Sequence, residues 1–346
     1  MMKIGIMAAW NTTSGVAMHA EPLGKALRDM GHKVHVFSFL KTDYHGEGIT
    51  AKDEKYVTRC FGTRNNTNSL DSRPFLERDY DVLLVEDTGM LPVDKLNNLF
   101  PVLKNKAKLV HVVHENRMTR HSWFYQHDWD KVVYFDHRQD FLKKIYPDAE
   151  YIPFPCFASR RGSKIEARKR LDLPLKKKIV YSFGHRGYHS YYRDLPPKLK
   201  KNTILLHVVP KEYQMLEELH PTDWMLVKPQ NVITTQQFDD YLFASDAAIL
   251  HKFTSRGHAV VSSTVYQALG AGCPIFVPSL SDFFHDWKNE LMHYKDVTAL
   301  SKQLVGVLGS EKKKKQIIEN AERFVEKHSP ERIAQKFVDL FERILS

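Results

Sequence analysis

Short apolar runs alternate with stretches of helical periodicity along most of the chain. The first run, "KIGIMAA", is followed by the turn-forming "NTTSG" and by a segment whose apolar residues recur at helical spacing from Val16 to Leu27, before Gly31 ends it. The apolar run "HKVHVFSF" comes next. This order predicts a strand, a crossover helix and a second parallel strand, which is the repeating unit of a doubly wound α/β fold.

Further predicted strands of the first half end in polar or charged residues. "YDVLLVED" ends in Glu86 and Asp87, "AKLVHVVHEN" contains His114 and Glu115 near its end, and "WDKVVYFD" ends in Asp136. Ligands of open α/β sheets bind beyond the carboxyl ends of the strands. We therefore expect the site residues of the first half among these side chains.

The predicted strands fall into two series, which indicates two domains. The second series contains "KIVYSFG", "NTILLHVV", "DWMLVKP", "DAAILHKF" and "CPIFVP". Between the series, residues 156–178 are basic and poor in large apolar side chains, which is typical of an interdomain connection. We predict an N-terminal domain of residues 1–158 and a C-terminal domain of residues 159–329, with the last helix, 330–346, packing back on the first domain. Both would be Rossmann-like domains facing a cleft.

Composition is that of a soluble globular enzyme. The chain has 346 residues, of which 42% are hydrophobic and 27% charged, and no apolar run approaches the roughly 18 residues that a membrane helix needs. The N-terminus lacks the features of a signal peptide. Cys60, Cys156 and Cys273 show no metal-site or disulfide spacing. We expect a cytoplasmic protein.

The net charge of +10 is divided unevenly along the chain. Residues 1–150 carry 21 Lys and Arg against 20 Asp and Glu, whereas residues 151–346 carry 30 against 21. The excess in the second half favours an anionic ligand such as a nucleotide diphosphate. Solvated lysine runs, "KKK" at 176 and "KKKK" at 312, account for much of it.

The stretch "SSTVYQALGAGCP" begins with three hydroxyl residues in front of a predicted short helix. The first turn of a helix exposes unpaired N–H groups, so Ser262, Ser263 and Thr264 are candidates to bind a phosphate. The alternative is that one of the serines only caps the helix. Gly270 and Gly272 would let the segment pack closely on a neighbouring strand.

Three cationic or titratable residues precede this stretch in "HKFTSRGH". Lys252, Arg256 and His258 are candidates to bind a diphosphate, Arg256 through its planar guanidinium, and each could instead be a surface residue. No pair of metal-binding carboxylates stands out nearby. We therefore expect cations rather than a metal ion to neutralise the diphosphate, and no cofactor.

The order of motifs resembles that of the GT-B glycosyltransferases of family 4, which transfer sugars from nucleotide-sugars. "SGVAMHAEPLGKALRDMGHKVHVFS", "AKLVHVVHEN", "DAEYIPFPC", "KKIVYSFGHRG", "VYQALGAGCPIFVP" and the terminal "AERFVEKHSPERIAQKFVDLFERIL" occur in the family's order. The resemblance runs nearly from end to end. It implies a GT-B fold, with the nucleotide-sugar in the C-terminal domain and the acceptor in the N-terminal domain.

Several positions depart from the family pattern. The family's two glutamates, eight positions apart, correspond to Ala259 and Gln267. Gln267 retains an amide that can bind a ribose hydroxyl. The family's Arg and Lys pair on the diphosphate is replaced by a different spacing, with Arg186 the candidate here and Arg193 further on. These departures indicate that the chain is either a remote branch of the family or a member with altered chemistry.

The resemblance also suggests residues of the first domain. Gly15 would let the first loop approach the ligand, although a glycine in a turn often has no other role. His19 is expected to face the cleft, where it is a candidate general base if the enzyme inverts configuration. The alternative is that His19 has only a structural role. His114 and Glu115 are candidates to contact the transferred sugar or the acceptor. In the hinge motif the family's Asn and Gly are replaced by Phe154 and Pro155.

The predicted function is therefore that of a hexosyltransferase acting on an acceptor hydroxyl, retaining and metal-independent, with a UDP- or GDP-linked donor. Open alternatives are a nucleotide-sugar epimerase or polyol-phosphate transferase of the same fold, and an inactive GT-B binding protein. The acceptor would be a sugar, a polyol or a lipid-linked molecule, with peripheral membrane contact conceivable. A nearly neutral first domain argues against nucleic acid. The first loop is not G-x-G-x-x-G, which argues against a dinucleotide-dependent dehydrogenase.

Overall fold

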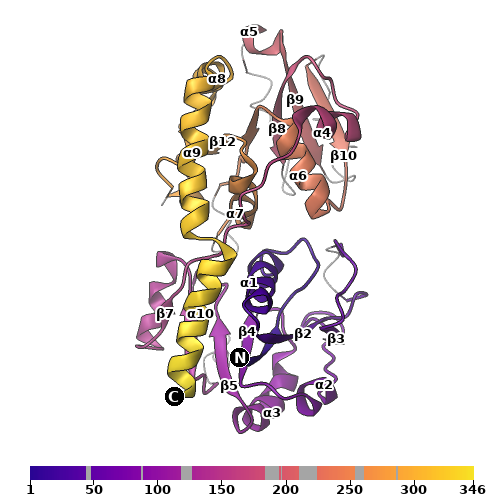
Figure 1. Cartoon of the computed structure of the whole chain (residues 1–346), viewed down its shortest axis with the longest axis vertical. Coiled ribbons are helices and arrows are strands. Elements are labelled where there is room, and N and C mark those ends of the chain that lie inside the picture. The colour runs from indigo at the N-terminus through magenta and orange to yellow at the C-terminus, as the bar shows by residue number, and fades with distance from the viewer. Residues whose placement is uncertain are drawn as a thin grey trace. The chain divides into compact units, whose positions relative to one another are not determined.

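The structure is a computed structural model that describes residues 1–43, 48–86, 89–117, 127–183, 195, 197–209, 224–253, 261–285 and 287–346. The chain divides into two compact units, which are coloured by residue number in Figure 1. The described parts of Met1–Pro155 and His328–Ser346 form most of unit 1. Those of Cys156–Thr254 and Thr264–Lys327 form unit 2.

Unit 1 is built on a seven-stranded sheet in which all the paired strands are parallel, in the order β3-β2-β1-β4-β5-β6-β7. Its central strands are apolar runs buried on both faces, as expected when helices cover both sides of a parallel sheet. The strands are β1 (Lys3–Met7), β2 (Lys33–Phe39), β3 (Val57–Phe61), β4 (Val82–Glu86), β5 (Lys108–Val112), β6 (Lys131–Tyr134) and β7 (Glu150–Tyr151).

The helices of unit 1 come from both ends of the chain. The last helix packs against α1, and its apolar face includes the fully buried Phe337 and Phe341. Ser329 caps this helix by accepting a hydrogen bond from the backbone N–H of Arg332. The elements are α1 (Ala17–Asp29), α2 (Arg73–Glu77), α3 (Val93–Lys104), the 3-10 helix η2 (His137–Lys144) and α10 (Pro330–Leu345).

Unit 2 repeats the plan with a six-stranded parallel sheet in the order β10-β9-β8-β11-β12-β13. The strands are β8 (Lys178–Phe183), β9 (Thr203–Val209), β10 (Met225–Pro229), β11 (Ala247–Ile249), β12 (Ile275–Pro278) and β13 (Met292–Tyr294). The helices are α4 (Lys164–Arg170), α5 (Pro197–Lys200), α6 (Thr235–Ala244), α7 (Ser263–Ala268), η5 (Leu269–Ala271), η6 (Asp282–Phe284), α8 (Val297–Leu308) and α9 (Glu311–Lys327).

The segment 156–178, which the sequence suggested was an interdomain connection, contains helix α4 packed against α6. Unit 2 begins at Cys156, and the basic composition of this segment includes a buried residue. The Arg168 guanidinium lies inside unit 2, where it donates to the Ala244 carbonyl and to an Asp246 carboxylate oxygen 2.9 Å away. A charged residue paired in this way belongs to a core despite its polarity.

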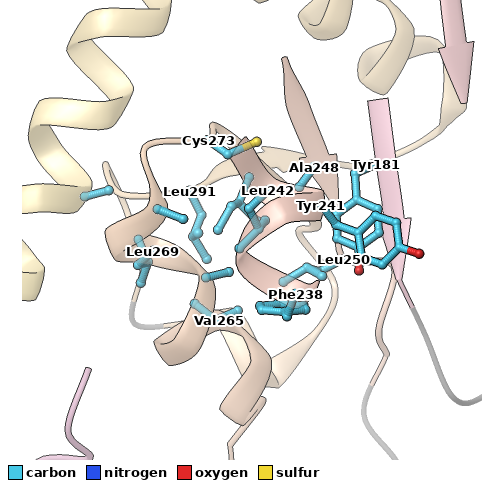
Figure 2. Packing of buried hydrophobic residues seen from close by; sticks show 14 of the residues in the cluster. Tyr181, Phe238, Tyr241, Leu242, Ala248, Leu250, Val265, Leu269, Cys273 and Leu291 are labelled. Atoms are coloured by element: carbon cyan, nitrogen blue, oxygen red, sulfur yellow. The ribbon is translucent and has the colours of Figure 1, made fainter. Parts of the chain in front are cut away.

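One apolar core of unit 2 surrounds α6 and the α7–η5 segment. Figure 2 shows Val265 and Leu269 of this segment among buried side chains that include Phe238 and Leu242 of α6. Gly270 is required for the close packing, because a Cβ atom at this position would lie 2.7 Å from the Ala158 carbonyl oxygen. The segment ends at Gly272, whose φ of 70° is left-handed.

Within the residues that the structure describes, no helix combines the length and the apolar character needed to cross a membrane.

Candidate active site

Both sheets have a point at which the order of the strands reverses, between β1 and β4 in unit 1 and between β8 and β11 in unit 2. The connections on the two sides of such a point lead away from each other, which leaves a crevice at the carboxyl ends of the strands where ligands of this fold class bind. Chemically active side chains at these two places are therefore candidates for the functional site.

The reversal point of unit 1 holds a cluster of two histidines and a glutamate from three different elements. His19 lies in the first turn of α1, Glu86 is the last residue of β4, and His114 lies two residues after the end of β5. The Glu86 Oε2 atom is 3.0 Å from His19 Nδ1 and 3.1 Å from His114 Nε2. We call these three residues the His-Glu-His cluster.

Two side chains of the cluster are buried and the third is partly exposed. The side chains of His19 and Glu86 are fully buried, whereas that of His114 is 11% exposed. Aromatic rings enclose His19: those of Phe135, Phe154 and Phe337 lie with their centroids 5.6, 5.1 and 6.1 Å from the imidazole. His19 thus faces the interior of unit 1, where the sequence suggested that it faces a cleft.

The departure from the family pattern at Phe154 has a structural role. Its ring packs edge-on against the His19 imidazole and against Phe135, so it forms part of the wall around the cluster. The family's asparagine in the hinge motif would leave this apolar wall incomplete. This contact could not be predicted from local sequence patterns, because Phe154 and His19 are far apart along the chain.

Glu86 is ionised despite its burial. Burial by itself raises the pKa of a carboxyl group, but the adjacent His19 and His114 outweigh it and bring the pKa of Glu86 down to about 2. His111 lies on β5, three residues before His114, and is also buried. Burial together with the charge of His114 lowers the pKa of His111 to about 3. His111 is therefore neutral near pH 7.

The segment that carries His114 and Glu115 is held in place by a buried glutamine. The Gln139 Nε2 atom donates to the carbonyl oxygens of Val113 and Glu115, and its Oε1 atom accepts from the backbone N–H groups of Phe135 and Asp136. All four hydrogen bonds of the amide are made inside the protein, which fixes the chain at the ends of β5 and β6. Glu115 itself is buried, beside His114.

The first loop is held by Asn11 rather than by Gly15. Gly15 is exposed and does not have a positive φ, whereas Asn11 is buried with a φ of 52°. The Asn11 backbone N–H donates to Glu21, and its side-chain amide donates to Asp53 and Glu54. An asparagine tolerates this left-handed conformation, and that is the signal by which the sequence could have revealed it.

In the second half of the chain, several candidates for nucleotide binding lie outside the described residues. Arg186, Arg256 and His258 belong to this group, as do Arg193 and Ala259. For these the sequence-based assignment stays a prediction.

The remaining candidates in this part of the chain are described. Lys252 lies three residues after β11, and its ammonium group rests 4.7 Å from the centroid of the Phe283 ring. Ser262 is buried, and Ser263 and Thr264 are half-buried at the start of α7, which is only six residues long. Gln267 is half-buried, and its backbone carbonyl oxygen accepts a hydrogen bond from the Arg160 guanidinium at 2.7 Å.

The residue types of the His-Glu-His cluster are also those that bind divalent metal ions, and its nitrogen and oxygen atoms lie within 4.8 Å of one another. The two contacts to Glu86 have ordinary hydrogen-bond lengths. Hydrogen bonding by itself therefore accounts for the arrangement.

No family model matches the sequence. Solved structures similar to this chain include the trehalose-6-phosphate synthase OtsA, with a TM-score of 0.65 and 9% identity over 98% of this chain and 99% of that one. An α-glucosyltransferase, AGT, in complex with UDP has a TM-score of 0.63 and 11% identity, and 100% of each chain is covered. BGT of T4 phage, in complex with UDP and Mn²⁺, has a TM-score of 0.51 and 14% identity, again covering 100% of each.

At these identities the likeness shows the fold. The two reversal points, the two parallel sheets and the match over whole chains agree with the fold class predicted from the sequence, which is confirmed: this chain has the two-domain α/β architecture of the GT-B glycosyltransferases.

Proposed function

We propose that this protein is a glycosyltransferase that moves a sugar from a nucleotide-diphosphate sugar to an acceptor hydroxyl. The observation that carries the proposal is the match to AGT with UDP, which covers both chains completely and leaves no domain of either unmatched. The arrangement of chemically active residues at the carboxyl edge of the unit 1 sheet supports it.

Unit 2 is the proposed binding site of the nucleotide. The basic excess of the second half of the chain favours a diphosphate, and hydroxyl or cationic side chains lie near the reversal point of its sheet. The residues that we assign to nucleotide binding are Gly15 from the first loop, Arg186, Lys252, Arg256, His258, Ser262, Ser263, Thr264 and Gln267.

Unit 1 is the proposed site of the acceptor and of the transferred sugar. His114, the partly exposed member of the cluster, is the residue that we assign to contact these molecules, with Glu115 beside it. We propose retention of configuration and no requirement for a metal ion. Since T4 phage BGT has been solved with Mn²⁺, activity should be compared in EDTA and in Mn²⁺.

The test is release of free nucleotide from a panel of UDP- and GDP-linked sugars with sugar, polyol and lipid-linked acceptors. We expect release that depends on an acceptor, and a loss of about 10²-fold or more in His114→Gln, the range of general acid–base or positioning contributions. His137→Gln is the matched control, because His137 is an exposed histidine of the same unit. Isomerisation of the donor without an acceptor would instead identify an epimerase, and no turnover of any donor would contradict the proposal.

A further inference from the structure

The inference concerns an exposed aromatic ring at the carboxyl edge of the unit 2 sheet. Strand β11 borders the reversal point, and the chain leaves the core just after it. Leu250 is still among the buried side chains in Figure 2, whereas Phe253, three residues further on, is 49% exposed. Of the phenylalanines that the structure describes, Phe253 is the one whose side chain is exposed. It lies where ligands of this fold class bind.

The ring of Phe253 rests against a fixed support. The His251 imidazole lies at 87° to it, with the two centroids 4.7 Å apart. The His251 Nδ1 atom is hydrogen-bonded at 2.5 Å to the hydroxyl group of Tyr294, a buried residue at the end of β13. The support therefore connects the ends of two strands. An edge-on contact of this kind covers at most one face of the Phe253 ring.

The residue between His251 and Phe253 is a cation directed to another part of the same edge. The Lys252 ammonium group lies 4.7 Å from the centroid of Phe283, which belongs to η6 after β12. Lys252 is already assigned to the diphosphate in the proposed function. A cation and an exposed ring on consecutive residues, with different neighbours, can contact the diphosphate and the base of one nucleotide.

The chemistry of the phenyl ring selects the base among the parts of a nucleotide. The ring has no charge and no hydrogen-bonding group, so it offers nothing to a phosphate or to a ribose hydroxyl. It does offer a π-face, on which every base can stack. The transferred sugar, whose apolar face could compete for the ring, is assigned to unit 1 in the proposed function.

We propose that the nucleobase of the donor stacks on Phe253, and that His251 and Tyr294 hold the ring in position. This inference rests on the proposed binding of a nucleotide by unit 2. Stacking on a phenyl ring adds affinity for UDP and for GDP alike. Phe253 therefore strengthens the binding of the nucleotide without selecting its base.

The experiment is calorimetric titration of the full chain with UDP, GDP, UDP-glucose and pyrophosphate. In Phe253→Ala the dissociation constants of UDP and GDP should rise by about tenfold or more, the usual range for loss of a base–aromatic stack, while that of pyrophosphate stays unchanged. Leu280→Ala is the matched control, because Leu280 is an exposed apolar residue two positions after β12 at the same edge. Its affinities should equal those of the wild type.

Phe253→Trp keeps a ring that can stack and adds a reporter. This variant should bind UDP at least as tightly as the wild type. UDP and GDP should change the fluorescence that the new tryptophan adds, because the base lies against the indole, whereas pyrophosphate should leave it unchanged. Urea unfolding of each variant should give the wild-type midpoint, since a half-exposed ring contributes little to the core.

The possible failures can be told apart. Equal affinities of Phe253→Ala and the wild type for UDP and GDP would overturn the inference and leave the proposed function standing. Weaker binding of pyrophosphate, to the same extent as UDP, would also overturn it, because the ring would then act on the diphosphate or on the fold. A loss seen with UDP-glucose and absent with UDP would place the sugar on the ring. Absence of nucleotide binding by the wild type would contradict the proposed function and the inference together.

Discussion

Glu86 in unit 1 and Asp246 in unit 2 are buried carboxylates at the ends of sheet strands, and they are compensated in different ways. Glu86 of unit 1 lies at the carboxyl end of β4 and contacts two histidines. Asp246 of unit 2 directly precedes β11, so it lies at the amino end, and it contacts Lys164 at 2.8 Å and Arg168 at 2.9 Å.

The partners of Asp246 are a lysine and an arginine, which stay positively charged near neutral pH, and the arginine also binds backbone groups of unit 2. Arg168 also donates to the carbonyl oxygens of Ala244 and Lys177, and Asp246 accepts from the backbone N–H of Ile179 at the start of β8. Burial by itself raises the pKa of Asp246, but Lys164 and the Ile179 N–H outweigh it and lower this pKa. The result is a structural ion pair that does not change charge near neutral pH.

Glu86 and Asp246 differ in the strand end at which they lie and in the type of residue that compensates their charge. Both carboxylates meet the same requirement, that a buried charge must have a partner. Glu86 lies at the reversal point on the carboxyl edge, where ligands of this fold class bind, and its partners are histidines, the residue type most often used for proton transfer. Asp246 lies at the amino end of its strand and is paired with a lysine and an arginine. We therefore read the unit 1 cluster as functional and the Asp246 cluster as structural.

The largest expected effect is on the structural pair. Arg168→Met removes the guanidinium and leaves Asp246 with less compensation, and breaking a buried pair costs about 3–5 kcal/mol. Urea unfolding should show this loss, while the donor KM of the folded variant at low temperature stays near the wild-type value. A loss below about 1 kcal/mol, as for a surface pair, would show that the ion pair does not hold unit 2 together.

The second effect is a loss of stability in acid that depends on Glu86. Its pKa is about 2 in the folded chain and near 4.5 in the unfolded chain, so the unfolded state binds the proton first and stability falls as the pH drops from about 4.5 to 2. The loss should be on the order of 3 kcal/mol. Unfolding free energies at a series of pH values should show a shallower fall over this range in Glu86→Gln; equal slopes would contradict the assignment.

Glu21 extends the comparison to a mostly buried carboxylate whose cationic partner, Lys25, is half-exposed. Burial raises its pKa to about 7, which Lys25 at 3.7 Å and the Asn11 N–H only partly oppose. Its stabilising contribution is complete below pH 4.5 and is lost as the pH rises to about 7.

Glu21→Gln should therefore be more stable relative to the wild type at pH 8 than at pH 5, by about 2 kcal/mol. Thermal unfolding at both pH values checks this. A difference of the opposite sign would mean that Glu21 is ionised in the folded chain.

The smallest effect concerns the amide at Gln267. A carboxylate accepts a stronger hydrogen bond from a ribose hydroxyl than an amide does, so Gln267→Glu should lower the dissociation constant of the nucleotide-sugar by up to about tenfold. Gln316→Glu, at an exposed position on α9, is the control with the same change of charge. Equal affinities in the two variants would place the ribose elsewhere.

Local patterns along the chain were sufficient to predict the fold and part of the site. Alternating apolar runs and helical segments predicted the two parallel sheets, and the polar ends of the strands pointed to Glu86 and His114. These signals work because the carboxyl ends of parallel strands share one edge of the sheet.

Contacts between distant segments could not be predicted in this way. Glu86 is 67 positions from His19 and 28 from His114, and no periodicity reports that both histidines turn toward one carboxylate oxygen. The rings of Phe154 and Phe337 reach His19 from after β7 and from α10. Helix α4 was missed for a related reason, because composition does not show that Arg168 points inward.

The most direct test of the central claim is calorimetric titration of the whole chain with UDP, GDP and their sugars. The account predicts one binding site for a nucleotide, with a dissociation constant in the range of about 1 μM to 1 mM that is usual for enzyme substrates. It also predicts weaker binding in Arg186→Ala and Arg256→Ala. Absence of binding for every nucleotide and nucleotide-sugar would contradict the assignment of this chain as a glycosyltransferase.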